Sequence, residues 1–259
     1  MMDKKTGVKQ RIYVSIVLTL IAFVAVTAAT VAWFSIADKT KVNTMGLDIV
    51  SDTELRMDVD PHPTIEEYVR TLSFATIAGR IQSEKGFNMQ TTPLEPVTTS
   101  DYKIFRYEDN SVVPATKGSY LEFTLHFMAA KDMIVHLTSA HSDDNITDGT
   151  MVSSNVAGLT QSMRISFTAD GQTWVYDPGM GDLRANTEGG AVFGLPGPAD
   201  MELSDNNAMF SLKEGQNKEV QVHIWIEGTD PACTDDLKSA QYSIRLRFSG
   251  TDMDGKPFS

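Results

Sequence analysis

The chain has 259 residues, of which 41% are hydrophobic, and its formal net charge is −12. This acidic balance excludes nucleic acid as an expected partner, because a phosphate-binding face needs clustered lysine and arginine. The single cysteine, Cys233, excludes an intrachain disulfide, so the fold depends on its hydrophobic core.

The N-terminal segment predicts export. A basic head precedes an uncharged run over residues 12–37. One interpretation is a signal peptide cleaved between Ala32 and Trp33, because small side chains at Thr30 and Ala32 suit a signal peptidase. The other is a membrane anchor, since about 20 apolar residues span the hydrocarbon core and the basic head stays inside. Residues 1–32 are therefore assigned as a signal peptide or a membrane anchor.

Residues 33–50 are predicted to be a linker that includes a candidate donor strand. A donor strand completes the β-sheet of a neighbouring chain, and apolar side chains at Val42, Met45, Leu47 and Ile49 would serve that purpose. An unpaired segment beside an open groove would favour exchange between chains. A central position in its own sheet would make the monomer complete.

Residues 51–259 are predicted to form an extracellular β-sandwich with an irregular insertion at about 60–118. Short apolar runs indicate early strands at 47–49 and 55–59. Period-2 alternation, which is typical of strands with one buried and one exposed face, occurs at 121–127, 163–168, 220–227 and 242–249, and residues 135–137 indicate a further strand. The pair Asp170-Gly171 predicts a hairpin turn. Helical spacing of apolar residues predicts a helix over 64–81.

These elements favour a mainly β fold, an antiparallel jelly-roll-like β-sandwich preceded by an N-terminal hydrophobic helix. The alternation places His126, His223 and Trp225 on exposed strand faces. Together with Trp174 and Tyr176, Trp225 is a candidate for stacking on a sugar ring. The edges of such sheets are templates for pairing with another chain.

No catalytic motif is present in the sequence. The five histidines lack the spacing of a zinc site, and no nucleophile elbow surrounds any serine. Carboxylates beside Cys233 are expected to raise its pKa. We therefore expect no cofactor, with a divalent cation left open at two acidic loops and their neighbouring histidines. Those loops contain Asp143, Asp144 and Asp148, near His136 and His141, and Asp230, Asp235 and Asp236.

Two segments carry a resemblance to a known group. The junction Ala32-Trp33-Phe34, followed by a polar stretch and a short strand, resembles proteins processed by the SipW-type signal peptidase, the camelysin/TasA-like group of bacterial surface and biofilm-matrix proteins. Residues 225–236 resemble surface proteins of anaerobic Firmicutes that carry this leader. The resemblance implies a jelly-roll subunit that polymerises when the freed N-terminal segment, here residues 33–50, completes a neighbour's sheet.

The sequence thus predicts a non-enzymatic, exported protein of the cell surface or biofilm matrix. Its expected partners are a signal peptidase, the membrane before cleavage, and further copies of itself in an extracellular fibre. One alternative is a membrane-anchored β-sandwich that binds a glycan. Another is a secreted metal-dependent peptidase, because some camelysin-like relatives bear that label, although this chain has no metal-peptidase motif.

Overall fold

The computed structural model describes residues 14–22, 43–51, 54–139, 149–180, 192–195 and 208–258. The chain divides into two units, Met1–Lys39 and Thr40–Ser259. In the first unit, residues 14–22 are helical. None of the helices in the described ranges has the length and apolar character needed to cross a membrane. The predicted cleavage site at Ala32 and Trp33 lies outside the described residues.

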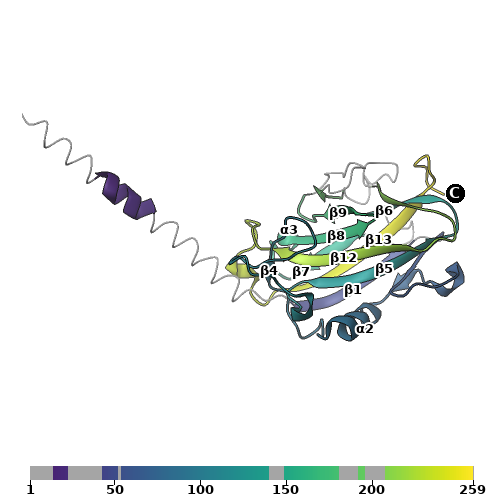
Figure 1. The fold of residues 1–259 in the computed structure, drawn as a ribbon, viewed down its shortest axis with the longest axis horizontal. Coiled ribbons are helices and arrows are strands. Elements are labelled where there is room, and N and C mark those ends of the chain that lie inside the picture. The colour runs from purple at the N-terminus through teal and green to yellow at the C-terminus, as the bar shows by residue number, and fades with distance from the viewer. Residues whose placement is uncertain are drawn as a thin grey trace, which may run out of the picture. The chain divides into compact units, whose positions relative to one another are not determined.

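The second unit is built from two β-sheets that pack face to face (Figure 1). The strands of the first sheet lie in the order β11-β6-β13-β1-β3, with β7 also paired to β13; they are β1 (Asn43–Ser51), β3 (Thr71–Leu72), β6 (Met133–Leu137), β7 (Met151–Ser154), β11 (Ala208–Leu212) and β13 (Gln241–Thr251). The strands of the second sheet lie in the order β10-β9-β8-β12-β5-β2, with β4 also paired to β12; they are β2 (Leu55–Asp58), β4 (Pro96–Val97), β5 (Leu121–Ala129), β8 (Met163–Ala169), β9 (Gln172–Tyr176), β10 (Val192–Phe193) and β12 (Lys218–Glu227).

The mainly β prediction is confirmed, and so are the individual strands. Each alternating segment forms a strand, because its apolar positions line the common core. The predicted hairpin joins β8 to β9, with positive φ angles of 52° at Asp170 and 80° at Gly171 that suit a two-residue turn. The prediction of purely antiparallel sheets is wrong, since β1 runs parallel to β13, β10 to β9, and β4 to β12.

The helix predicted over 64–81 begins later than expected. The structure has a 3-10 turn η1 (Ile65–Glu67), then β3, and then helix α2 (Phe74–Lys85). Two end signals set these bounds: Ser73 accepts a hydrogen bond from the Thr76 N–H at the start, and Gly86 adopts a left-handed φ of 82° at the end. The remaining short helices are η2 (Ala115–Lys117), α3 (Leu159–Ser162) and η4 (Asp235–Leu237).

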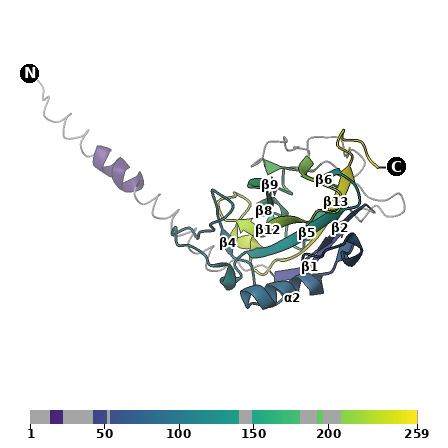
Figure 2. The same ribbon diagram turned by 45° about the vertical axis from the view of Figure 1, so that its right-hand side comes forward.

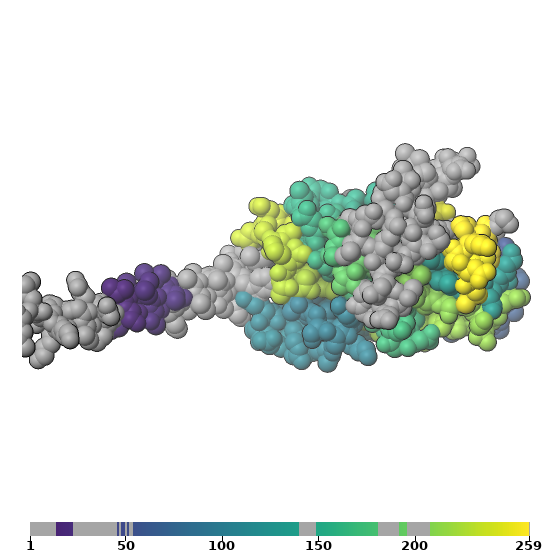
Figure 3. All heavy atoms as spheres, turned by 90° about the horizontal axis from the view of Figure 1, so that it is seen from above, coloured from purple at the N-terminus to yellow at the C-terminus, as the bar shows by residue number. Residues whose placement is uncertain are grey.

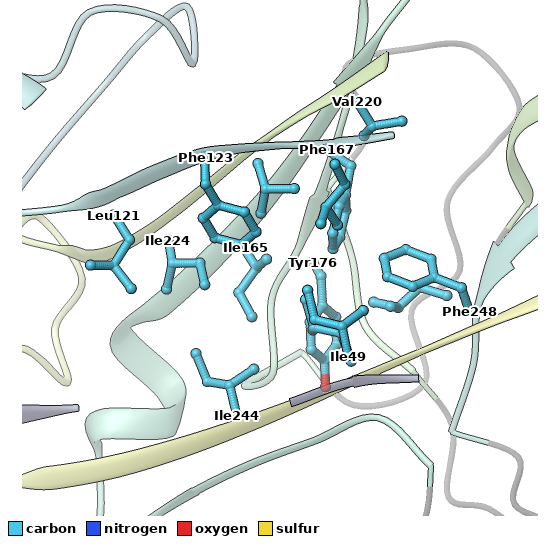
Figure 4. Packing of buried hydrophobic residues seen from close by; sticks show 14 of the residues in the cluster. Ile49, Leu121, Phe123, Ile165, Phe167, Tyr176, Val220, Ile224, Ile244 and Phe248 are labelled. Carbon is cyan, nitrogen blue, oxygen red and sulfur yellow. The ribbon is translucent and has the colours of Figure 1, made fainter. Parts of the chain in front are cut away.

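The core between the sheets is dominated by aromatic and branched aliphatic side chains. Figure 4 shows Phe123, Phe167 and Ile224 of the second sheet facing Ile49 and Phe248 of the first. Helix α2 adds Ile77 and Ile81, both fully buried, and contacts β1 and β5 from the side. Figures 1 and 2 agree that α2 lies beside β1 at the margin of the two sheets.

A second, smaller apolar cluster lies on the outer face of the second sheet. The insertion contributes Val97, Phe105 and Val113, which pack with Tyr120, just before β5, on Val175 and Trp225. In the space-filling view of Figure 3, the blue-teal part of the insertion gathers as one packed mass on the surface of the domain. The prediction that these strands have an exposed outer face is therefore wrong where the insertion covers them.

The insertion depends on a tight contact at Gly118. This residue has a φ of 78°, and a Cβ there would lie 2.6 Å from Thr92 Cγ2 and 2.9 Å from Phe87 Cδ2. Gly86 has a similar φ of 82° but no atom within 4 Å of its Cβ position. We expect Gly86→Ala to cost about 1 kcal/mol from backbone strain and Gly118→Ala to cost about 1–3 kcal/mol more.

Chemical denaturation of the two variants separates strain from crowding. The expected result is a lower midpoint for Gly118→Ala than for Gly86→Ala at equal slope. Equal midpoints would show that the insertion is not held closely at this position.

Candidate functional site

The strand β1 contains the predicted donor residues, and it lies between β13 and β3 in its own sheet, which is the arrangement of a complete monomer rather than of an unpaired donor segment. It pairs in parallel with β13 from Asn43↔Gln241 to Ser51↔Phe248. Ile49 is 0% exposed and belongs to the core. Met45 and Leu47 lie in this strand, of which the structure describes the backbone at these two positions. Val42 lies outside the described residues.

The register of this pair contains a bulge. Thr44 pairs with Tyr242 and Gly46 pairs with Ser243, so Met45 is an extra residue without a partner position on β13. A bulge interrupts the two-residue period of a strand. The two-residue period of β1 is therefore interrupted at Met45.

The C-terminal end of β1 is held by the residues that follow it. The Ser51 N–H donates to the Arg70 carbonyl at 2.8 Å, and the Ser51 hydroxyl donates to the Leu55 carbonyl at 2.7 Å. On the edge away from β13, β3 pairs with β1 only at Ile49 and Val50. Within the described part of the chain, the preceding residues of β1 have no strand on that edge.

The outer face of the second sheet holds a polar row that crosses three strands. His223 Nε2 lies 3.4 Å from Glu122 Oε2, and His223 Nδ1 lies 3.5 Å from Ser166 Oγ. Lys85 of α2 donates to the other Glu122 oxygen. The predicted exposure of His223 is wrong: it is 1% exposed, because Phe105 of the insertion lies over it with ring centroids 5.2 Å apart.

This order of serine, histidine and carboxylate is that of a hydrolytic triad, but the row is sealed. Ser166 is 0% exposed, so a substrate has no route to its hydroxyl in this structure. The row instead links β5, β8 and β12 to α2. The apolar–polar alternation in the sequence places Glu122, Ser166 and His223 on the face of each strand that points away from the core. This alternation is the sequence signal that could have identified the row.

The ionised form of Glu122 stabilises the fold. The imidazole of His223, 3.4 Å away, is the largest cause of the lowered pKa of Glu122; together with Lys85 it outweighs the effect of burial and lowers that pKa from 4.5 to about 2. A lowered carboxyl pKa contributes stability that is present above the ordinary value and is lost as the pH falls toward the folded value. After solvent screening, we expect a loss on the order of 1–2 kcal/mol between pH 4.5 and pH 2.

This pH dependence is measurable by denaturation at a series of pH values. Glu122→Gln should reduce the acid-induced loss, whereas Asp236→Asn, a change at an exposed residue, should leave it intact. An unchanged acid profile in Glu122→Gln would assign the effect to other carboxylates.

A second polar network fixes the insertion to the start of β5. Glu95 Oε2 accepts hydrogen bonds from the hydroxyls of Tyr107 and Ser119, both at 2.8 Å, and Lys117 Nζ lies 3.2 Å away. Burial alone would raise the pKa of Glu95, but these hydrogen bonds and the lysine charge outweigh it and lower that pKa. The cover over His223 is therefore anchored by a charged group.

The aromatic residues predicted to stack on a sugar are not available for that role. Trp225 and Trp174 are each 1% exposed, and Tyr176 is also buried. Trp225 Nε1 donates to Glu227 Oε2 at 3.0 Å, which satisfies its polar atom inside the covered cluster. Trp225 is buried because the insertion excludes water from its face of the sheet. Trp174 and Tyr176 are buried because they belong to the main core.

The histidines are distributed over the fold. His126 is buried, contrary to the prediction, and His136 is buried with Nε2 2.9 Å from Thr251 Oγ1. His62 lies between Asp58 and Glu67, at 3.3 and 3.5 Å. Among the residues that the structure describes, no group of three or more potential ligands has the geometry for a metal ion.

The structure describes one of the two acidic loops that were considered for a divalent cation. The loop with His141, Asp143, Asp144 and Asp148 lies outside the described residues. In the second loop, Asp230 binds Arg164 at 2.6 Å and accepts the Ala232 N–H at 2.8 Å. Asp235 instead pairs with Lys238 at 2.9 Å.

The prediction for Cys233 is confirmed in direction. The pKa of its thiol is raised to about 12, mainly by burial and further by the charges of Asp230 and Glu227. Such a thiol stays protonated at neutral pH and is a poor nucleophile. Burial rather than the neighbouring carboxylates is the larger cause.

Comparison of the chain with protein-family models, with curated proteins and with solved structures finds no match.

Proposed function

We propose that this chain is a non-enzymatic, exported protein of the bacterial surface or biofilm matrix that assembles by exchange of its first strand. The proposal rests on the position of β1 as the first strand of the domain; because β1 already completes its own monomer, exchange requires that β1 first leaves its own sheet. It comes after the hydrophobic N-terminal segment in the sequence, separated from it by residues 38–42, pairs along its length with the last strand β13, and places Ile49 in the core. A jelly-roll-like subunit of this kind would accept the same strand from a second copy.

The physical basis is that strand exchange conserves the pairing of β1 with β13. The β1 strand of one chain can make the same backbone hydrogen bonds to β13 of another chain as it makes within its own. Only residues 52–54 join β1 to β2, so this short connection would have to extend. Exchange in one direction along a series of chains is head-to-tail and produces an open fibre.

The first test uses cysteine pairing between chains. A Cβ at Gly46 would lie 3.6 Å from Ser243 Cβ, which is within the range of a disulfide. One chain carries Gly46→Cys and another carries Ser243→Cys, and both carry Cys233→Ala and begin at Trp33. If β1 is exchanged, mixing under assembly conditions and oxidation should give a disulfide-linked dimer on a non-reducing gel.

The control places both cysteines in one chain. Oxidation before assembly should lock β1 in place and keep the protein monomeric, and reduction should restore fibre formation seen by negative-stain microscopy. Fibres from the locked chain, or fibres without the cross-link between chains, would rule out exchange of β1. A chain that remains monomeric in every form would rule out assembly.

Export is tested separately on the native protein. N-terminal sequencing of material from the cell surface and culture fluid should give an end at Trp33. An intact N-terminus in the membrane fraction would instead indicate a retained anchor, which leaves β1 tethered and contradicts fibre assembly by a freed strand.

A further inference from the structure

A polar cleft of about 460 Å³ opens near one end of the second sheet. It is lined by the end of β8 and its turn to β9, by the end of β11, and by the connection from β11 into β12. Ligand pockets for small molecules fall in this volume range. The cleft is separate from the triad-like row, because its lining includes neither His223 nor Glu122.

The lysines in the cleft are paired with carboxylates. Its lining contains two lysines, Lys213 and Lys218, and two carboxylates, Asp170 and Glu219. Lys218 Nζ donates to Asp170 Oδ2 at 2.5 Å, and Lys213 Nζ donates to Asp132 Oδ2 at 2.6 Å. Both lysines of the lining are therefore paired with carboxylates, while Glu219 adds a negative charge, so the described lining does not favour an anion.

Neutral hydrogen-bonding groups remain for a ligand. The side chains of Gln216, Gln221 and Ser211 line the cleft and are not tied in hydrogen bonds to other described residues. Asn217 Oδ1 accepts the Tyr68 hydroxyl at 2.9 Å, which orients the amide and leaves its NH₂ group to donate elsewhere. A side-chain amide offers one acceptor and two donors, which matches the paired hydroxyls of a sugar.

We propose that this cleft binds a neutral saccharide. Its amides and hydroxyl contact the sugar hydroxyls. The site differs from the aromatic face suggested by the sequence, and it does not depend on strand exchange. A protein with both properties would hold a polysaccharide within the material that it forms.

The test is a binding screen of the folded chain that begins at Trp33. The probes are an array of neutral oligosaccharides built from hexoses, 6-deoxyhexoses and N-acetylhexosamines, with acidic oligosaccharides and extended peptides beside them. Hits are measured by calorimetry with wild type, with Gln221→Leu, and with Thr124→Val. Thr124 pairs with Gln221 on the neighbouring strand and is outside the cleft lining, so it is a matched control.

We expect at least one neutral saccharide to bind, with affinity about tenfold weaker in Gln221→Leu, because lost hydrogen bonds of about 1 kcal/mol each account for that factor. Affinity should be unchanged in Thr124→Val and at raised salt. Absence of neutral saccharide binding at millimolar concentration overturns the proposal. So does binding that Gln221→Leu leaves intact, or binding confined to acidic sugars or peptides. Unfolding curves for both variants show whether any loss reflects misfolding.

Discussion

Ile49→Asp is expected to unfold the isolated domain. Ile49 is 0% exposed and packs in the core between the sheets, and it is the described side chain of β1 that enters that core. Truncating a buried isoleucine to alanine costs about 2–5 kcal/mol, and burying an unpaired carboxylate adds several more. The total is a large share of the roughly 5–15 kcal/mol that stabilises a typical domain.

The matched control is Ile104→Asp, which makes the same chemical change at an isoleucine that is 45% exposed. Circular dichroism and size-exclusion chromatography should show a folded Ile104→Asp and an expanded Ile49→Asp. If Ile49→Asp retains a cooperative transition near that of wild type, then β1 is not an integral strand of the core.

Arg164→Met is expected to be strongly destabilising at neutral pH. Arg164 Nη2 lies 3.0 Å from Asp177 Oδ2 and 2.6 Å from Asp230 Oδ2, and it thereby joins the start of β8, the end of β9 and the loop after β12. All three side chains are largely buried. Removing the cation leaves two partly buried carboxylates facing each other, which costs about 3–5 kcal/mol.

The pH dependence of this variant has a definite sign. Burial raises the pKa of Asp177 in the wild type, while the charge of Arg164 opposes that rise and Asp230 adds to it. Without Arg164 the pKa of Asp177 rises further. A carboxyl group with a raised folded pKa binds more protons in the folded state, so Arg164→Met should regain stability as the pH falls through that pKa.

A triple variant is the control for the buried charges. Arg164→Met with Asp177→Asn and Asp230→Asn removes the whole cluster, and it should be more stable at neutral pH than Arg164→Met alone. Equal unfolding midpoints for the single and triple variants would show that the carboxylates do not depend on this arginine.

The strands were predictable because their signal is local. In β5 and β12 the apolar and polar residues alternate, and a strand directs alternate side chains to opposite faces. The ends of α2 were also present in the sequence as Ser73 and Gly86, but the apolar spacing upstream of Ser73 gave an earlier start.

The pairing of β1 with β13 was not predictable from alternation. Almost two hundred positions separate Asn43 from Gln241, and the two-residue period carries no information about which distant strand lies alongside or in which direction. The same limit applies to the outer face of the second sheet. The alternation places the Trp225 side chain on the sheet face opposite to that of Ile224. Trp225 is buried there because the insertion, with Phe105, packs over it.

The parallel alignment of β1 and β13 also determines how the domain responds to force. Asn43 and Gln241 lie at one end of the pair, and Ser51 and Phe248 lie toward the other. Tension between a tether before Asn43 and an attachment beyond Thr251 therefore pulls the two strands past each other along their axes. Beyond the bulge at Met45, the hydrogen bonds of this parallel pair carry the load together rather than breaking one by one. The domain is thus arranged to resist stretching in shear, and its lifetime under load is governed by the unfolding rate.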